Sequence, residues 1–384
     1  MQPIYADVDI SQLSKVGEEL CGDRVEVVRT PQSTIVVLSD GLGSGVKANI
    51  LATMTTKIAS SMLKRGIALS EVVDTIAETL PVCKQRKIAY STLHILTITA
   101  SGDTTVIEFD CPASFLVRNR QVFPFPTQDK MVAGKLIKEG QLALTENDII
   151  VIVSDGVIHA GIGGLLRLGW GWNGVAKYLG DYLKELPDEA ITAAAIGKML
   201  INACEGYYLG KPGDDTTVVA IKMRYPHELV ILTGPPENSM DDYKVVRRFL
   251  NSPGKKVIAG GMTANIFSRI TGRPLSVDLN YYDLAVPPIG HISDIDLVTE
   301  GVLTLNRVVE KLAVHRLQRG EDGATLLANL LVEADNVTIL AGKAINAAHQ
   351  NPKFPAHINI KSQVLSKLQQ LLESQGKHVL VEWL

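Results

Sequence analysis

The sequence has few cysteines and no long apolar run, and these absences exclude several classes of protein. The four cysteines, Cys21, Cys83, Cys111 and Cys204, show no CxxC or Cys/His spacing, so we expect buried or structural thiols rather than a zinc site or disulfides. The apolar runs are far shorter than the roughly 20 residues that a membrane helix needs. The first ten residues also lack the charged start and apolar core of a signal peptide. We therefore expect a cytoplasmic protein without a membrane partner.

The charge balance and the length narrow the class further. The net charge of −3 provides no basic field that would attract nucleic acid. The chain has 384 residues, more than one core usually supports, so two domains are expected. A change in sequence texture near Tyr225 and Pro226 places the boundary there, giving domains of residues 1–225 and 226–384.

Strand and helix patterns predict an α+β architecture for residues 1–225. Residues 22–40 read as a hairpin around the turn signal TPQS. After it, Val46, Ile50, Met54, Ile58 and Met62 form a helical stripe that ends at Gly66, and Ser70 is the expected cap of a second helix. Three strand-like segments between residues 90 and 119 are expected to form an antiparallel meander. Two more helices are expected at about 174–186 and 188–204.

Residues 226–384 alternate between strand-like and helix-like segments, which predicts a parallel, Rossmann-like α/β domain. Its glycines recur where a predicted strand precedes a helix, the edge at which ligands bind in open α/β sheets. Thr263 and Thr304 stand near two of the predicted helix starts, where amide groups favour anions. No GxGxxG or P-loop motif occurs here, which argues against a conventional dinucleotide or P-loop site. Binding of another small ligand, docking of a partner and formation of a homodimer all stay open.

Four aspartates in the first domain stand beside glycine turns at the ends of apolar strand-like runs. They are Asp23, Asp40, Asp155 and Asp214. One aspartate in a turn needs no function, because its side chain satisfies nearby backbone donors. Four in one domain, however, would repel one another unless a cation neutralised them. Oxygen ligands without histidine suit Mg²⁺ or Mn²⁺, and two such ions can clamp a phosphoryl group and activate a bridging water.

Five segments together resemble the PPM (type 2C) metal-dependent serine/threonine phosphatases, in particular the SpoIIE-like bacterial branch. In order they are GDRVEV, VVLSDGLGSGVKAN, YSTLHILTI, NDIIVIVSDGV and PGDDTTVVAIKM. The resemblance covers about residues 1–225 and implies an α-β-β-α sandwich with two Mn²⁺ or Mg²⁺ ions. It further implies hydrolysis of phosphoserine or phosphothreonine on a regulatory partner protein, by attack of a hydroxide that bridges the metals.

By the same resemblance, specific residues take specific roles. Asp40 would bridge both ions, and Gly41 would offer its carbonyl to one of them. Asp155 and Asp214 would hold the other ion, and Asp23 would act through bound water. The catalytic set is thus Asp40, Asp155 and Asp214, with Asp215 as a less certain neighbour. The helices that begin near Ser44 and Ser70 would be the switch helices of this branch, although core packing of an amphipathic helix would equally explain their apolar stripe.

Several other residues keep more than one interpretation. The segment DCPASFLVRN has Asp110 and Cys111 where relatives have a glycine before the proline, which puts the local turn in question. Arg24 or Arg29 could bind substrate phosphate, but a solvated strand charge is favoured for both. His159, near the expected metals, could act as a general acid. His94 lies in the middle of a predicted strand and is expected to be structural.

Two rival functions remain at this point. One is a catalytically silent phosphatase fold that only binds a partner. The other is a C-terminal domain that acts on a small molecule under control of the phosphatase domain, although it lacks an evident acid, base or nucleophile cluster.

Overall fold

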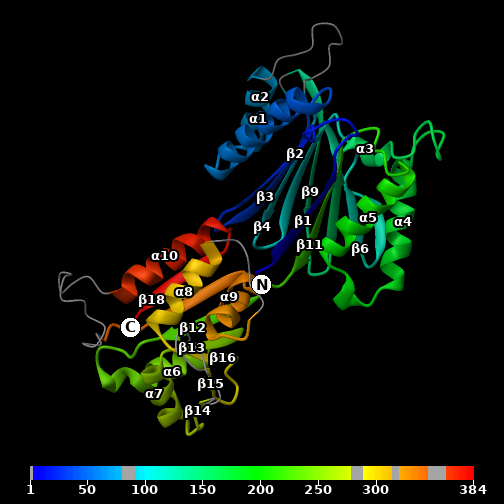
Figure 1. Cartoon of the computed structure of the whole chain (residues 1–384). Coiled ribbons are helices and arrows are strands. Elements are labelled where there is room, and N and C mark those ends of the chain that lie inside the picture. Colours follow the sequence, from blue (N-terminus) through cyan, green and yellow to red (C-terminus); the bar gives the residue numbers. More distant parts are fainter. Residues whose placement is uncertain (1–2, 80–90, 133, 278–288, 314–319, 345–359) are drawn as a thin grey trace. The chain divides into compact units, whose positions relative to one another are not determined.

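The computed structural model describes residues 3–79, 91–132, 134–277, 289–313, 320–344 and 360–384. The chain divides into two compact units, Met1–Tyr225 and Pro226–Leu384 (Figure 1). Among the described helices, none is both long and apolar enough to cross a membrane.

The first unit consists of two antiparallel sheets with helices on their outer faces. One sheet has the order β2-β3-β4-β5-β9-β8 and the other the order β1-β11-β10-β6-β7. The strands of the first sheet are β2 (Asp23–Arg29), β3 (Ser33–Asp40), β4 (Leu93–Thr99), β5 (Asp103–Phe109), β8 (Gln128–Val132) and β9 (Lys135–Ala143). Those of the second are β1 (Tyr5–Leu13), β6 (Phe115–Arg118), β7 (Gln121–Pro124), β10 (Ile149–Val153) and β11 (Thr216–Arg224).

Successive side chains of a strand point to opposite faces of its sheet. In each sheet, one face therefore packs against the other sheet and the opposite face packs against helices. Val36 and Leu38 on β3 belong to the core between the sheets, whereas Ile35 and Val37 pack with α1 and α2. The second sheet packs its outer face against α4 and α5. The helices are α1 (Gly45–Lys64), α2 (Leu69–Thr79), α3 (Asp155–Ile158), α4 (Gly171–Glu185), η1 (Asp188–Ala190) and α5 (Ala193–Tyr207). Figure 1 shows this helix–sheet–sheet–helix layering, and the mixed α+β fold is confirmed.

Only the second half of the predicted stripe on the first helix packs against the core, where Ile58 and Met62 are partly buried. Val46, Ile50 and Met54 are about half exposed. The helix packs instead through small residues, including Ala48 and Ala52, which are fully buried. Small side chains let the helix approach the sheet closely, so core packing does not explain the large apolar residues at the start of the stripe. Ser70 is likewise not the cap, because α2 begins one residue earlier, at Leu69.

The expected three-stranded meander is wrong in its last strand. β4 and β5 pair antiparallel as predicted, but β6 pairs with β10 and β7 in the other sheet. The chain crosses between the sheets after Asp110, which has a φ of 56°, a left-handed conformation that aspartate tolerates better than most residues. The strand β1, which the sequence patterns did not indicate, completes the second sheet by pairing with β11.

The second unit is built on one mixed sheet with the order β14-β15-β16-β13-β12-β17-β18. The five neighbouring strands β16, β13, β12, β17 and β18 pair in parallel. In contrast, β14 and β15 form an antiparallel edge that the alternating pattern did not indicate. The strands are β12 (Glu228–Thr233), β13 (Lys255–Ala259), β14 (Ser276–Val277), β15 (Gly290–His291), β16 (Leu297–Thr299), β17 (Asn336–Ala341) and β18 (His378–Trp383).

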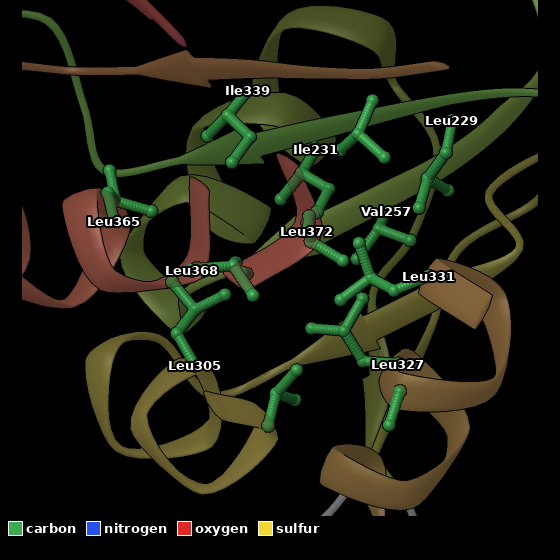
Figure 2. Packing of buried hydrophobic residues seen from close by; sticks show 14 of the residues in the cluster. Leu229, Ile231, Val257, Leu305, Leu327, Leu331, Ile339, Leu365, Leu368 and Leu372 are labelled. Carbon is green, nitrogen blue, oxygen red and sulfur yellow. The ribbon is translucent and has the colours of Figure 1, made fainter. Parts of the chain in front are cut away.

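Helices cover both faces of this sheet. One face packs against α6 and α7, and the other against α8, α9 and α10. Figure 2 shows the second of these layers, with Leu305, Leu327 and Leu368 directed at strand residues such as Ile231 and Val257. The helices are η2 (Ser239–Asp241), α6 (Asp242–Leu250), α7 (Gly261–Thr271), α8 (Val302–Ala313), α9 (Gly323–Glu333) and α10 (Ile360–Ser374).

Candidate metal centre

The aspartates predicted from the sequence stand at strand ends of the first unit. The β2–β3 hairpin sets Asp23 opposite Asp40 in the antiparallel register, and side chains in such pairs have Cβ atoms about 4.5–5.5 Å apart. In the other sheet β10 and β11 are neighbours. Asp155 follows the end of β10 and Asp214 precedes the start of β11, so these two also share one end of a sheet.

Asp40 is the electrostatic centre of this group. Burial, followed by the charges of Asp23, Asp155, Asp214 and Asp215, raises its pKa from 3.8 to about 9. Like charges raise a carboxyl pKa in this way only when they lie close together. The structure therefore gathers carboxylates from both sheets around Asp40.

Only one of the two carboxylate oxygens of Asp23 has a hydrogen-bond partner. Its side chain is buried, and Thr217 Oγ1 donates a hydrogen bond of 2.7 Å to Oδ2. Burial raises the pKa of Asp23 to about 6, although hydrogen bonds from Thr217 and Ser154 oppose the shift. The other oxygen, Oδ1, is buried without a hydrogen-bond partner. An unsatisfied buried oxygen is costly, and a cation or its bound water is the group that would satisfy it.

Asp155 is a partly exposed member of the group. Burial and then the charge of Asp214 raise its pKa, which the nearby His159 partly offsets. His159 Nδ1 lies 3.7 Å from Asp155 Oδ2 and is half exposed. His159 is thus beside the carboxylates, as expected. His94, by contrast, is fully buried in the core.

Asp215 uses both oxygens to hold the backbone. Oδ2 accepts a hydrogen bond of 2.9 Å from the Gly22 amide and Oδ1 one of 3.0 Å from the Lys15 amide. These bonds fix the segment before Asp23 against the loop that carries Asp214. Asp215 therefore positions the cluster, in keeping with its lesser place in the prediction.

Three supporting residues were not singled out from the sequence. The hydroxyl of Ser154 accepts a hydrogen bond of 2.9 Å from the Thr217 amide. Tyr208 Oη donates one of 2.7 Å to the Gly156 carbonyl, directly after Asp155. Ser154 and Thr217 lie in the two acidic motifs themselves, so their place beside the aspartates was the available signal. Tyr208 offered no local signal.

Glycine beside two of the aspartates permits close backbone approach. A Cβ on Gly41 would lie 2.0 Å from the Ala48 carbonyl oxygen. A Cβ on Gly156 would lie 2.1 Å from the Asp215 carbonyl oxygen. Because real Cβ atoms do not approach so closely, both turns require glycine to bring α1 and the β11 loop against the carboxylates.

The donor set suits a hard divalent cation, although it is not a closed cage. No group of three or more His, Cys, Asp or Glu side chains in the described residues is arranged to hold a metal ion. Mg²⁺ commonly takes only one or two protein carboxylates and keeps several waters. The mutual repulsion of the carboxylates and the unsatisfied Asp23 Oδ1 fit ions that are held by few protein ligands and by water.

The two arginines considered for phosphate binding lie in different places. Arg29 is at the far end of β2, six residues or about 20 Å along the strand from Asp23, and it donates to the Ala6 carbonyl at 2.9 Å. It is therefore engaged away from the cluster. Arg24 is exposed and directly follows Asp23.

The family model for stage II sporulation protein E (SpoIIE) matches residues 30–224. The chain belongs to this family, as the motifs predicted. No curated protein matched the chain.

Three of the solved structures that resemble parts of this chain are compared with it by identity, TM-score and coverage. The PP2C domain of SpoIIE from Bacillus subtilis with a fragment of its regulatory domain is 19% identical, with a TM-score of 0.49, covering 59% of this chain and 64% of that one. The RsbU and RsbW domains of a Mycobacterium tuberculosis protein are 17% identical, with a TM-score of 0.47, and the match covers 70% of this chain and 72% of that one. RsbX in complex with magnesium is 17% identical, with a TM-score of 0.42, and the match covers 58% of this chain and 100% of that one. This chain thus spans under two thirds of the Bacillus structure.

Proposed function

We propose that residues 1–225 form a metal-dependent phosphatase that hydrolyses phosphoserine or phosphothreonine on a regulatory partner protein. The observation that carries this proposal is the position of Asp40, where burial and then the charges of four other carboxylates raise its pKa to about 9. Folding gathers negative charge at this point against a large electrostatic cost. Bound cations would offset this repulsion between the carboxylates. The match to the SpoIIE family supports phosphoester hydrolysis as the reaction.

The proposed ligands are the aspartates and one carbonyl named from the sequence. Asp40 would contact both ions, Gly41 would offer its carbonyl to one, Asp155 and Asp214 would hold the other, and Asp23 would act through bound water. Two Mn²⁺ or Mg²⁺ ions, when bound, would clamp the phosphoryl group and acidify the water that attacks phosphorus.

The remaining residues of the cluster would hold these ligands in position. Thr217 fixes one oxygen of Asp23, and the other oxygen is buried without a hydrogen-bond partner. Asp215 ties the segment before Asp23 to the loop before β11. Such supporting hydrogen bonds commonly orient metal ligands and tune their affinity.

Hydrolysis assays with and without metal test the proposal. We expect the full chain to hydrolyse p-nitrophenyl phosphate and a phosphothreonine peptide with Mn²⁺, and to lose the activity with EDTA or with Asp40→Asn. Asp181→Asn is the matched control, because Asp181 lies on the exposed side of α4. Activity that survives both chelation and Asp40→Asn would refute the metal mechanism. Mn²⁺ binding without turnover of either substrate would instead support the catalytically silent module.

We further propose that residues 226–384 form a Rossmann-like regulatory unit that senses a small ligand. The parallel strands run in the order β16-β13-β12-β17-β18, so the chain reverses direction across the sheet between β12 and β17. Ligands in open α/β sheets bind at the carboxyl edge at such a point. Gly234 and Gly342 follow these two strands, and Lys361 Nζ donates a hydrogen bond to the Gly342 carbonyl there. Burial lowers the pKa of Lys361.

Thermal unfolding with candidate ligands tests this second proposal. A ligand that binds only the folded unit raises its stability, so we expect a nucleotide or a related anion to raise the unfolding midpoint of the full chain. Lys361→Met should abolish the rise. If none of a panel of nucleotides shifts the midpoint, the unit is a docking scaffold and not a sensor.

A further inference from the structure

Tyr208 lies at the point where the end of α5 meets the two acidic turns of the second sheet. It directly follows α5, and its amide donates a hydrogen bond of 2.9 Å to the Cys204 carbonyl. Leu209 and Gly210 then have left-handed φ values of 53° and 72°. These two residues end the helix and turn the chain back towards Asp214.

The phenol group of Tyr208 reaches the turn that carries Asp155. Its hydroxyl donates a hydrogen bond of 2.7 Å to the Gly156 carbonyl. In a continuing helix, the Ala160 amide would be the donor to this carbonyl. That amide instead bonds to the Val157 carbonyl, at 3.3 Å. A side chain about 50 positions away in the sequence therefore supplies a bond that the single turn of α3 does not supply itself.

The loop that carries Asp214 is part of the same junction. Thr216 is fully buried, and its hydroxyl donates a hydrogen bond of 3.1 Å to the Asp214 carbonyl. A Cβ on Gly156 would lie only 2.8 Å from the Thr216 hydroxyl oxygen. The backbone after Asp155 thus lies directly against the loop of Asp214, and Tyr208 holds that backbone from the side of α5.

The electrostatics of Tyr208 agree with this position. Burial raises its pKa to about 12, and the charges of Asp214 and Asp155 add to the shift. Negative charges act in this way only at short range, so the phenol oxygen lies near both carboxylates. The phenol stays protonated at neutral pH and can donate its hydrogen bond.

We propose, on the basis of the metal centre proposed above, that Tyr208 is a positioning residue for the ion that Asp155 and Asp214 would hold. Glycine at position 156 allows the peptide group after Asp155 wide rotation, and the bond from Tyr208 fixes that group. Because side-chain rotamers depend on the backbone dihedrals, a fixed peptide restricts the direction of the Asp155 carboxylate. Outer hydrogen bonds of this kind change metal affinity by roughly 10- to 100-fold.

Calorimetric titration of the full chain with Mn²⁺ tests the assignment. Tyr208→Phe removes only the hydroxyl oxygen. Tyr207→Phe is the matched control, because the Tyr207 ring packs against Trp170, with 5.0 Å between the ring centroids. We expect the dissociation constant of one Mn²⁺ ion to rise about 10-fold in Tyr208→Phe, and to change by less than about 2-fold in the control.

The outcomes separate this assignment from the metal centre itself. Mn²⁺ binding by the unsubstituted protein with an unchanged dissociation constant in Tyr208→Phe would overturn the role of Tyr208 alone. An equal loss of affinity in Tyr207→Phe would also overturn it, because the effect would then be a general one of α5. Failure of the unsubstituted protein to bind Mn²⁺ would refute the metal centre and the role of Tyr208 together.

A second background tests whether Tyr208 acts through Asp155. Substitutions that act through one shared residue are not additive. In Asp155→Asn protein, the further substitution Tyr208→Phe should therefore change the affinity of the remaining Mn²⁺ by less than about 2-fold. A further loss of about 10-fold in that background would contradict the assignment, because Tyr208 would then act on the metal by another route.

Discussion

Asp40→Asn should stabilise the metal-free protein at neutral pH, even though it removes a proposed metal ligand. Burial and the neighbouring carboxylates raise the pKa of Asp40 from 3.8 to about 9. At pH 7 the folded metal-free protein therefore keeps this carboxyl protonated, whereas the unfolded chain ionises it. The stability that the carboxyl contributes is fully present below pH 3.8 and is lost as the pH rises from 3.8 towards 9. Asparagine does not titrate and avoids this loss.

The size of the effect follows from the pH interval. Each pH unit above 3.8 costs about 1.4 kcal/mol, which sets an upper limit of about 4 kcal/mol at pH 7. Asp40 is partly solvated and shares its charge with coupled neighbours, so about 2 kcal/mol is the expected gain. For a unit of this size, about 2–4 °C per kcal/mol corresponds to a midpoint about 4–8 °C higher.

Thermal unfolding in EDTA at pH 4 and pH 7 measures this gain. The tryptophans of α4 and its approach, Trp170 and Trp172, report on the first unit, and Asp181→Asn serves as the charge-matched control. We expect a higher midpoint for Asp40→Asn at pH 7 and no difference at pH 4. A lower midpoint at pH 7, or an equal gain at pH 4, would refute the reasoning.

Three further predictions concern packing and the buried ion pair. Gly41→Ala should destabilise the first unit by about 1–3 kcal/mol in urea unfolding, because its Cβ would lie 2.0 Å from a carbonyl oxygen of α1, whereas Gly206→Ala, with open space around it, should stabilise by about 0.5–1 kcal/mol. Ile50→Ser on the exposed side of α1 should change stability by less than about 0.5 kcal/mol, whereas Ala52→Ile on its packed face should cost about 1–3 kcal/mol. Glu108→Gln should cost about 3–5 kcal/mol near neutral pH in the same assay, because the buried imidazolium of His94, whose Nε2 lies 3.5 Å from Glu108 Oε1, would lose its partner.

Local signals in the sequence predicted the elements well, but not their pairing. The hairpin of β2 and β3 was predictable because one turn joins two β-branched runs. The place of β6 was not, because its partner β10 lies about 30 residues further along and only packing between the sheets selects it. The antiparallel edge formed by β14 and β15 was missed for the same reason.

The buried face of α1 was mispredicted in the first half of the helix, because the large apolar residues there lie on the exposed side. Val46, Ile50 and Met54 repeat every four residues, yet the sheet packs against Ala48 and Ala52. Close approach of the helix to the turn at Gly41 leaves room only for small side chains. A stripe of alanine, threonine and glycine was the available signal.

The candidate metal centre could be predicted residue by residue where each aspartate stands at the end of a strand beside a glycine. The structure places Asp23 opposite Asp40 and couples both to Asp155. The orienting role of Thr217 could not be predicted, because its bond to Asp23 joins residues 194 positions apart.

Anomalous scattering from crystals grown with MnCl₂ would locate the proposed metal ions. We expect two manganese peaks in the first unit, both within about 2.5 Å of an Asp40 oxygen, with one also beside Asp155 or Asp214. Crystals saturated with Mn²⁺ that show no peak at Asp40, or peaks only elsewhere on the protein, would contradict the proposed metal centre.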